Sequence, residues 1–192
     1  LNNIDVLLTQ GHTIYVSING SDSNYGTHQH STFRTLKHAL SQAVSGDEVV
    51  IFPGTYTEDF PLTVPQGVSV RGSGIRAVKI QPSAGTNNKD CFLLNGETLV
   101  SYLSITGMNY DSVNNTGYAF RFANGMKVTS KSPYVLNVTV INTGSTSTTY
   151  STQYSQTSLA YAWHHVAWTR ASGVNKYVAA AATTKQSRYS RI

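Results

Sequence analysis

The sequence is short of charge, cysteine and long apolar segments, and each shortage excludes a class of protein. Charged residues make up 12% of the 192 residues, against about 25% in typical soluble domains. Long amphipathic helices with charged outer faces are therefore not expected. The single cysteine, Cys91, excludes a framework of internal disulfides. No apolar run approaches the roughly 18 residues that a membrane-spanning helix needs, so no membrane insertion is expected.

The start of the chain also lacks familiar signals. No basic region is followed by an apolar core, so we expect no secretory signal peptide. The first residue is not methionine, which predicts a processed chain or a piece of a longer one. No Cys/His cluster has the spacing of a structural zinc site, and neither a metal nor an organic cofactor is expected.

Charge is distributed unevenly along the chain. All nine acidic residues lie within residues 1–111, where six Lys or Arg accompany them and the net charge is −3. Residues 112–192 hold the other eight Lys or Arg and no acid, a net charge of +8. A basic half can bind nucleic acid, an acidic glycan or an acidic protein, or it can lie against another subunit. These charges form no run, so nucleic acid is not the expected partner.

Glycine, serine, threonine and asparagine are abundant, and they favour strands and turns. Residues 13–18 predict a strand rich in β-branched and aromatic residues. One helix is predicted over residues 32–45, capped by Ser31 or Thr32 and ended near Gly46. Its apolar positions have helical spacing and are Phe33, Leu36, Ala39, Leu40, Ala43 and Val44.

After the helix, short apolar runs recur, each ended by a glycine, proline or asparagine turn. No helical segment separates the runs, which favours the coils of a solenoid over a β-sandwich, the main alternative. A solenoid of stacked strands exposes an open end, and a helix just before the first coil would cover it. The predicted strands are Glu48–Phe52, Leu62–Val64, Val68–Val70, Val78–Ile80, Cys91–Leu94, Leu99–Ile105, Tyr118–Phe122, Tyr134–Ile141 and Leu159–Thr169.

An ordered series of residues between positions 14 and 72 supports the same fold. It runs Tyr15-Val16-Ser17, Gly20-Ser21-Asp22-Ser23-Asn24, Gly26-Thr27, Phe33-Arg34-Thr35-Leu36, Ala39-Leu40, Ala43, Gly46-Asp47, Val49-Val50-Ile51, Pro53-Gly54-Thr55-Tyr56, Glu58 and Gly67-Val68-Ser69-Val70-Arg71-Gly72. The series resembles the N-terminal cap and first coils of pectate-lyase-like right-handed β-helix proteins. The same opening occurs in polysaccharide lyases, in surface proteins and in tail proteins of bacteriophages, notably those of marine cyanobacteria. The resemblance is thus specific for fold and not for activity.

The resemblance implies an all-β fold, a short right-handed parallel β-helix with an N-terminal capping α-helix and a C-terminal β arm. We expect an N-terminal strand and turn segment over residues 1–30 and a capped β-helix over 31–144. Residues 145–192 would form a Ser/Thr/Tyr-rich linker and a basic arm. Within this arm, Trp163–Arg170 with Gly173 is similar to one strand of laminin-G-like or concanavalin-like lectin sandwiches. Such sandwiches need far more residues, so no complete lectin domain is expected.

The resemblance also suggests where catalysis would be sought, because lyases of this kind use acidic Ca²⁺ ligands with an Arg or Lys base, and hydrolases use Asp pairs. Calcium needs about six to eight oxygens, and glycoside hydrolysis needs two carboxyls about 5 to 9.5 Å apart. The coil region offers few acids, and adjacent acids on a strand would diverge. No catalytic site is therefore predicted. Candidates for an enzymatic alternative are Glu58, Asp59, Asp90, Glu97 and Asp111, with Arg121 as base.

Other polar residues have two interpretations each. Asp22 and Asn24 could bind a cation, but bonds from their side chains to the backbone of a turn are favoured. Asp47 follows the helix and is expected to be structural. A solvated loop is expected around His28 and His30, and Cys91 is expected to be a small core residue.

Aromatic residues of the basic half could stack on sugar rings or pack in a subunit interface, where Tyr and Trp are enriched. The interface is favoured. The predicted contact residues are Tyr150, Tyr154, Tyr161, Trp163, His165, Trp168 and Arg170.

The leading functional prediction is a non-enzymatic structural protein of a bacteriophage tail, as a fibre, spike or baseplate component of the virion. It would supply a rigid β-helix spacer and an interaction arm. The expected partners are further copies of the chain, as a homotrimer, and other tail proteins. The alternatives are a lyase or hydrolase of surface polysaccharide and a glycan-binding tailspike module, either of which would contact a host surface glycan.

Overall fold

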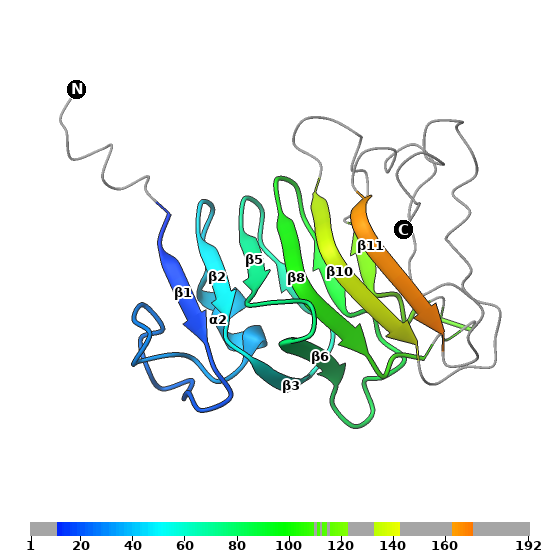
Figure 1. The fold of residues 1–192 in the computed structure, drawn as a ribbon, viewed down its shortest axis with the longest axis horizontal. Coiled ribbons are helices and arrows are strands. Elements are labelled where there is room, and N and C mark those ends of the chain that lie inside the picture. Colours follow the sequence, from blue (N-terminus) through cyan, green and yellow to red (C-terminus); the bar gives the residue numbers. More distant parts are fainter. Residues whose placement is uncertain are drawn as a thin grey trace.

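The structure is a computed structural model, and it describes most of the chain between residues 11 and 142 (Figure 1). Residues 11–109, 111, 113–114, 116–122 and 133–140 are described with their side chains, and 141–142 and 163–170 by their backbone. The described part is all-β, with parallel sheets and one short helix. Its elements are β1 (Thr13–Val16), α2 (Leu36–Gln42), β2 (Glu48–Ile51), β3 (Gly54–Glu58), β4 (Leu62–Val64), β5 (Ser69–Gly72), β6 (Val78–Pro82), β7 (Phe92–Leu94), β8 (Leu99–Thr106), β9 (Phe120–Phe122), β10 (Tyr134–Asn142) and β11 (Trp163–Arg170).

Most strands belong to one large parallel sheet. Its strand order is β1-β2-β5-β8-β10-β11, and Figure 1 shows these strands side by side with their arrows in one direction. The strand β3 pairs in parallel with β6, and β6 pairs with the second half of β8. A separate parallel sheet has the order β4-β7-β9. Each pass of the chain therefore adds strands beside those of the previous pass.

The core consists of rows of apolar side chains that repeat from strand to strand. In-register pairing aligns one buried position on five successive strands of the large sheet. β-Branched side chains pack well on a pleated surface, and burial of each contributes about 1.5 to 3 kcal/mol. The residues of this row are Ile14, Val49, Val70, Val100 and Val135.

The smaller sheet contributes two of the largest fully buried side chains. Phe92 on β7 lies opposite Phe120 on β9, and both are fully buried. Their ring centroids are 5.7 Å apart and their planes differ by 12°, so the rings are stacked. Leu62 on β4 precedes them in the same row. The parallel register thus repeats a single core position on all three strands.

The long strands β8 and β10 each bend at one residue in the left-handed region. Tyr102 has φ 56° and Asn137, its neighbour on β10, has φ 51°. Before this point β8 pairs with β5, and after it β8 pairs with β6. A Cβ on Gly72, at the end of β5, would lie 2.2 Å from the Tyr102 carbonyl oxygen. Glycine is therefore required where β5 ends against the bend.

The helix begins later than the sequence predicted. Thr35, rather than Ser31 or Thr32, is the N-cap, with φ −109° and ψ 141° and with its side chain accepting from the His38 N–H. The residues before it are held in another way, because the backbone of Phe33 pairs with β1. That pairing overrides the earlier capping signal in the sequence.

The helix also ends earlier than predicted, at Gln42, with Ala43 as C-cap. Its inner face is formed by Leu36, Ala39 and Leu40, as the spacing predicted. Val44 was predicted to belong to that face, which is wrong: it follows the helix and is 62% exposed. The helix packs against β1, β2, β3 and β4, and so covers the N-terminal end of the core.

The predicted strands are present, with small differences at their ends. The sequence did not predict β3, because Gly54–Glu58 contains a single apolar residue. In the structure Tyr56 and Glu58 are both buried and their neighbours face outward. The Tyr56 hydroxyl donates to the Phe52 carbonyl oxygen at 2.7 Å, which explains how its polar end is satisfied. Burial raises the pKa of Tyr56 to about 12.

Candidate functional site

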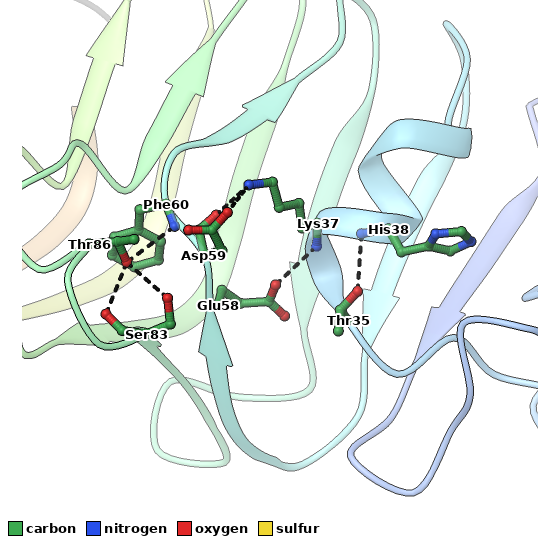
Figure 2. Close-up of polar contacts among 8 residues, drawn as sticks. All are labelled: Thr35, Lys37, His38, Glu58, Asp59, Phe60, Ser83 and Thr86. Carbon is green, nitrogen blue, oxygen red and sulfur yellow. Dashed lines mark hydrogen bonds and ion pairs between the residues drawn. The ribbon is translucent and has the colours of Figure 1, made fainter.

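Glu58, the first candidate acid, is turned into the protein at the end of β3. Only 3% of the residue is exposed. One carboxylate oxygen accepts the Leu36 N–H at 2.7 Å. The other accepts the Lys37 N–H at 3.1 Å, as Figure 2 shows. Burial raises the pKa of Glu58, and these two hydrogen bonds oppose the shift. Both carboxylate oxygens of Glu58 are thus hydrogen-bonded to backbone N–H groups in the first turn of α2.

Asp59 points the other way, as expected for adjacent acids around a strand end. Its side chain is 60% exposed and forms an ion pair with Lys37, with 2.5 Å between the carboxylate oxygen and Nζ. Figure 2 shows the Glu58 and Asp59 carboxylates meeting different parts of Lys37. The hydrogen bond from Lys37 lowers the pKa of Asp59. The pair therefore does not present two carboxyls to one substrate.

Asp90 and Arg121 form an ion pair between the loop before β7 and strand β9. The side chains are 11% and 27% exposed. Asp90 also accepts the N–H groups of Gly117 and Tyr118, each at 3.0 Å. The Arg121 guanidinium lies 5.2 Å from the centre of the Tyr118 ring. Arg121 is the candidate base of the enzymatic alternative, and the structure places it against a carboxylate that joins two passes of the chain.

The two remaining candidate acids, Asp111 and Glu97, lie in loops between strands. Asp111 accepts the N–H groups of Val113 and Asn114 and the side-chain amides of Asn88 and Asn114. The hydrogen bonds from Asn114 lower the pKa of Asp111. Glu97 has φ 59° in the turn between β7 and β8. Of the five candidate acids, Glu58 and Asp59 share Lys37 as a hydrogen-bond partner, the first through its backbone N–H and the second through its Nζ.

The loop after β1 is shaped by two polar side chains, as predicted. Asp22 accepts the N–H groups of Arg34 and Thr35, each at 2.9 Å. The side-chain amide of Asn24 donates to the Thr32 carbonyl at 2.9 Å. Although burial opposes the shift, the hydrogen bonds from Thr35 and Arg34 lower the pKa of Asp22. His28 and His30 lie exposed in the same loop.

Asp47 and Cys91 are structural, as predicted. Asp47 is 4% exposed and accepts the N–H groups of His12 and Val44. Cys91 is fully buried, and burial raises the pKa of its thiol.

Two outward features lie on the large sheet. Arg71 on β5 forms an ion pair with Glu48 on β2, with 2.8 Å between Nε and the carboxylate oxygen. The sequence alone does not show that these two residues lie on adjacent strands, because that follows from the parallel pairing of β2 with β5. Tyr102 and Tyr134 are partly exposed on β8 and β10.

The predicted contact residues lie partly in β11 and partly outside the described residues. Tyr150, Tyr154 and Tyr161 lie outside the described residues. The backbone of Trp163, His165, Trp168 and Arg170 lies in β11, which pairs in parallel with β10. Trp163 is in register with Val135 and Trp168 with Val140, two core positions of β10.

Two features are absent from the described part of the chain. No group of three or more His, Cys, Asp or Glu within it could hold a metal ion. No helix within it is long and apolar enough to cross a membrane.

Parallel sheets, one short helix and acids bound to the backbone define an all-β protein built by repeated parallel passes. The chain belongs to the family described as "Protein of unknown function (DUF1565)", which matches residues 18–153. It is also similar to the protein described as "Uncharacterized protein YwoF" of Bacillus subtilis (strain 168), with 52% identity over 48 residues. That match covers 25% of this chain and 10% of the relative, so the chain spans a small part of the relative's length.

Proposed function

We propose that the described region is the capped start of a right-handed parallel β-helix and acts as a non-catalytic structural spacer. In this proposal the protein is a component of a bacteriophage tail, where it associates as a homotrimer and contacts other tail proteins.

The strand pairing supports the β-helix. Five strands of the large sheet are in register over their buried positions, and a second sheet repeats alongside with the order β4-β7-β9. Connections between parallel strands of one sheet are right-handed in about 98% of cases. A chain that contributes a strand to each sheet on every turn, with right-handed connections, is a right-handed parallel β-helix.

The non-catalytic assignment rests on one observation, the use made of the acids. Five carboxylates each accept two backbone N–H groups, and this use satisfies irregular backbone at the cap and in the loops. These backbone contacts account for the five carboxylates without a substrate, which supports a structural use for them. The five are Asp22, Asp47, Glu58, Asp90 and Asp111.

The location in a phage tail is supported by the resemblance of residues 14–72 to the opening of phage-tail β-helix proteins. A spacer needs a rigid core that repeats along its length, and its surface need not carry a specific site. The rows of apolar side chains supply such a core. The basic half of the chain suits attachment to an acidic partner in the particle.

Polysaccharide cleavage is the decisive test of the non-catalytic assignment. The chain would be incubated with surface polysaccharides of candidate hosts, and reducing ends would be measured over time. We expect no release above that of a heat-treated sample. Release that disappears in Glu58→Gln or Asp90→Asn, but persists in the control Glu48→Gln, an exposed acid outside the candidate set, would establish an enzyme instead.

The assembly and location need two further measurements. Light scattering at two concentrations should give the mass of a trimer, and a monomer would contradict self-trimerisation. Gold-labelled antibodies against the chain should decorate tails in electron micrographs of particles from its source. Labelling confined to a cell surface would contradict the virion assignment.

A further inference from the structure

The first turn of α2 is held by an unusually complete set of side-chain oxygens. Five consecutive backbone N–H groups, from Arg34 to His38, all donate to them. Asp22 receives the first two, Glu58 the next two, and the Thr35 hydroxyl the last. That hydroxyl also donates to Asp22 at 2.8 Å. Two carboxylates from different parts of the chain thus converge on one helical turn.

The loop that carries Asp22 closes the free edge of β1. The Tyr15 N–H donates to the Gly26 carbonyl at 2.7 Å, and the Ser17 N–H donates to the Phe33 carbonyl at 2.9 Å. The Phe33 N–H returns a hydrogen bond to the Tyr15 carbonyl at 2.9 Å. The edge of the large sheet is therefore paired with residues of the same chain.

The helix of this cap, which is defined as residues 20–43, packs against the first strands of the chain. The helix packs against β1, β2, β3 and β4. Lys37 adds the ion pair to Asp59 just after β3, which Figure 2 shows beside the Glu58 contact. In a stacked fold, stability is close to a sum of contacts between neighbours, so an end unit can open by itself.

We propose that the cap is a latch that opens as a unit while the later strands stay folded, and that the β1 edge it exposes pairs with a second copy of this chain. Opening breaks the hydrogen bonds at Asp22 and Glu58 and leaves the edge groups of Tyr15 and Ser17 without partners. Unpaired strand edges recruit other strands.

A second copy fits this edge because the pairing can be symmetric. In an antiparallel pair centred on Tyr15, Ile14 of one copy lies opposite Val16 of the other. Residues opposite each other in such a pair have side chains on the same face. The buried residues of both β1 strands would then form one apolar surface. A two-fold contact of this kind uses the same edge of both copies, so it produces a closed dimer.

Hydrogen exchange measured by mass spectrometry tests whether the cap opens as a unit. Asp22→Ala and Glu58→Ala each remove two acceptors, so exchange in residues 20–43 should quicken about tenfold to a hundredfold. Exchange in β7, β8 and β10 should not change. Asp111→Ala is the matched control, because it removes a side-chain carboxylate that accepts two backbone N–H groups outside the cap. Equal acceleration in all strands would overturn the latch, and so would no acceleration in the cap.

Light scattering over a concentration series tests the second half of the proposal. The Asp22→Ala/Glu58→Ala variant should gain mass with concentration beyond any association of the parent chain. Adding Thr13→Lys should reverse the gain, since lysine on an edge strand disfavours pairing. The pairing would be overturned if hydrogen exchange shows that the cap opens in the Asp22→Ala/Glu58→Ala variant while the mass of that variant does not rise with concentration. A gain that Thr13→Lys leaves unchanged would place the contact elsewhere and would also overturn it.

Discussion

The N-terminal end and the later passes of the chain are held together by different interactions. At the N-terminal end, carboxylates bind backbone N–H groups of a loop and a helix that do not repeat. In the later strands, apolar rows and the stacked rings of Phe92 and Phe120 repeat one position from strand to strand. Where pairing is regular the ladder satisfies the backbone, and where it is interrupted an acid does so. Five acids of the described region therefore mark places where no ladder pairs the backbone.

The largest effect should come from the repeated core. Phe92→Ala removes a fully buried ring and leaves a cavity between Leu62 and Phe120. We expect a loss of about 3 to 5 kcal/mol in the free energy of unfolding. Urea denaturation followed by circular dichroism measures it. A loss below about 1 kcal/mol would show that the smaller sheet does not form part of the core.

The next largest effect should come from the ion pair that joins two passes. Asp90→Ala leaves Arg121 and the N–H groups of Gly117 and Tyr118 without this acceptor. We expect a loss of about 2 to 3 kcal/mol. Glu48→Ala, which removes an exposed acid from a pair of similar type, is the control. Equal losses of unfolding free energy in the two variants would show that burial of the acid does not decide how much its ion pair stabilises the protein.

Asp22 and Glu58 should respond to pH in opposite directions. The folded pKa of Asp22 lies below its ordinary 3.8, so its contribution to stability is present above that value and lost as the pH falls. The folded pKa of Glu58 lies above its ordinary 4.5, so its contribution is largest below that value and declines as the pH rises.

The corresponding variants separate the two acids. Asp22→Asn should cost about 1 kcal/mol near neutral pH and less in acid. Glu58→Gln should cost more in acid than near neutral pH. Urea midpoints at pH about 3 and about 7 measure both. Parallel pH dependences would contradict the different environments assigned to the two carboxylates.

The smallest effect should come from the outer surface. Arg71→Gln removes the ion pair with Glu48, in which the side chains are 45% and 40% exposed. We expect less than about 0.5 kcal/mol, because water and salt screen exposed pairs. The difference from the parent chain should shrink further in high salt. A loss as large as that of Asp90→Ala would show that exposure does not decide the strength of these pairs.

The elements were largely predictable from the sequence, because they depend on local patterns. Short apolar runs identified most strands, and the spacing of Leu36, Ala39 and Leu40 identified the helix face. The start of the helix was not predictable, since Phe33 pairs with β1 and leaves capping to Thr35. The strand β3 was missed because Glu58 occupies a buried position that patterns reserve for apolar residues.

The partners of the polar residues depend on register between distant strands, which a sequence alone does not supply. Nothing near Asp90 in the sequence indicates Arg121, because 31 positions separate them. The turn-forming roles of Asp22 and Asn24 were predictable, since Asp and Asn form such bonds routinely. The role of Glu58 at the helix was not.

The parallel ladder also sets how the protein responds to mechanical load. In the sheet β1-β2-β5-β8-β10-β11 the hydrogen bonds between strands run along the direction in which strands are added. Tension between the two ends of this series pulls directly on the bonds of one ladder after another, so strands would detach in sequence at low force. Compression in the same direction is resisted by contacts between side chains such as Val70 and Val100, which are already close-packed. The described region is therefore expected to transmit a push along its strand series better than a pull.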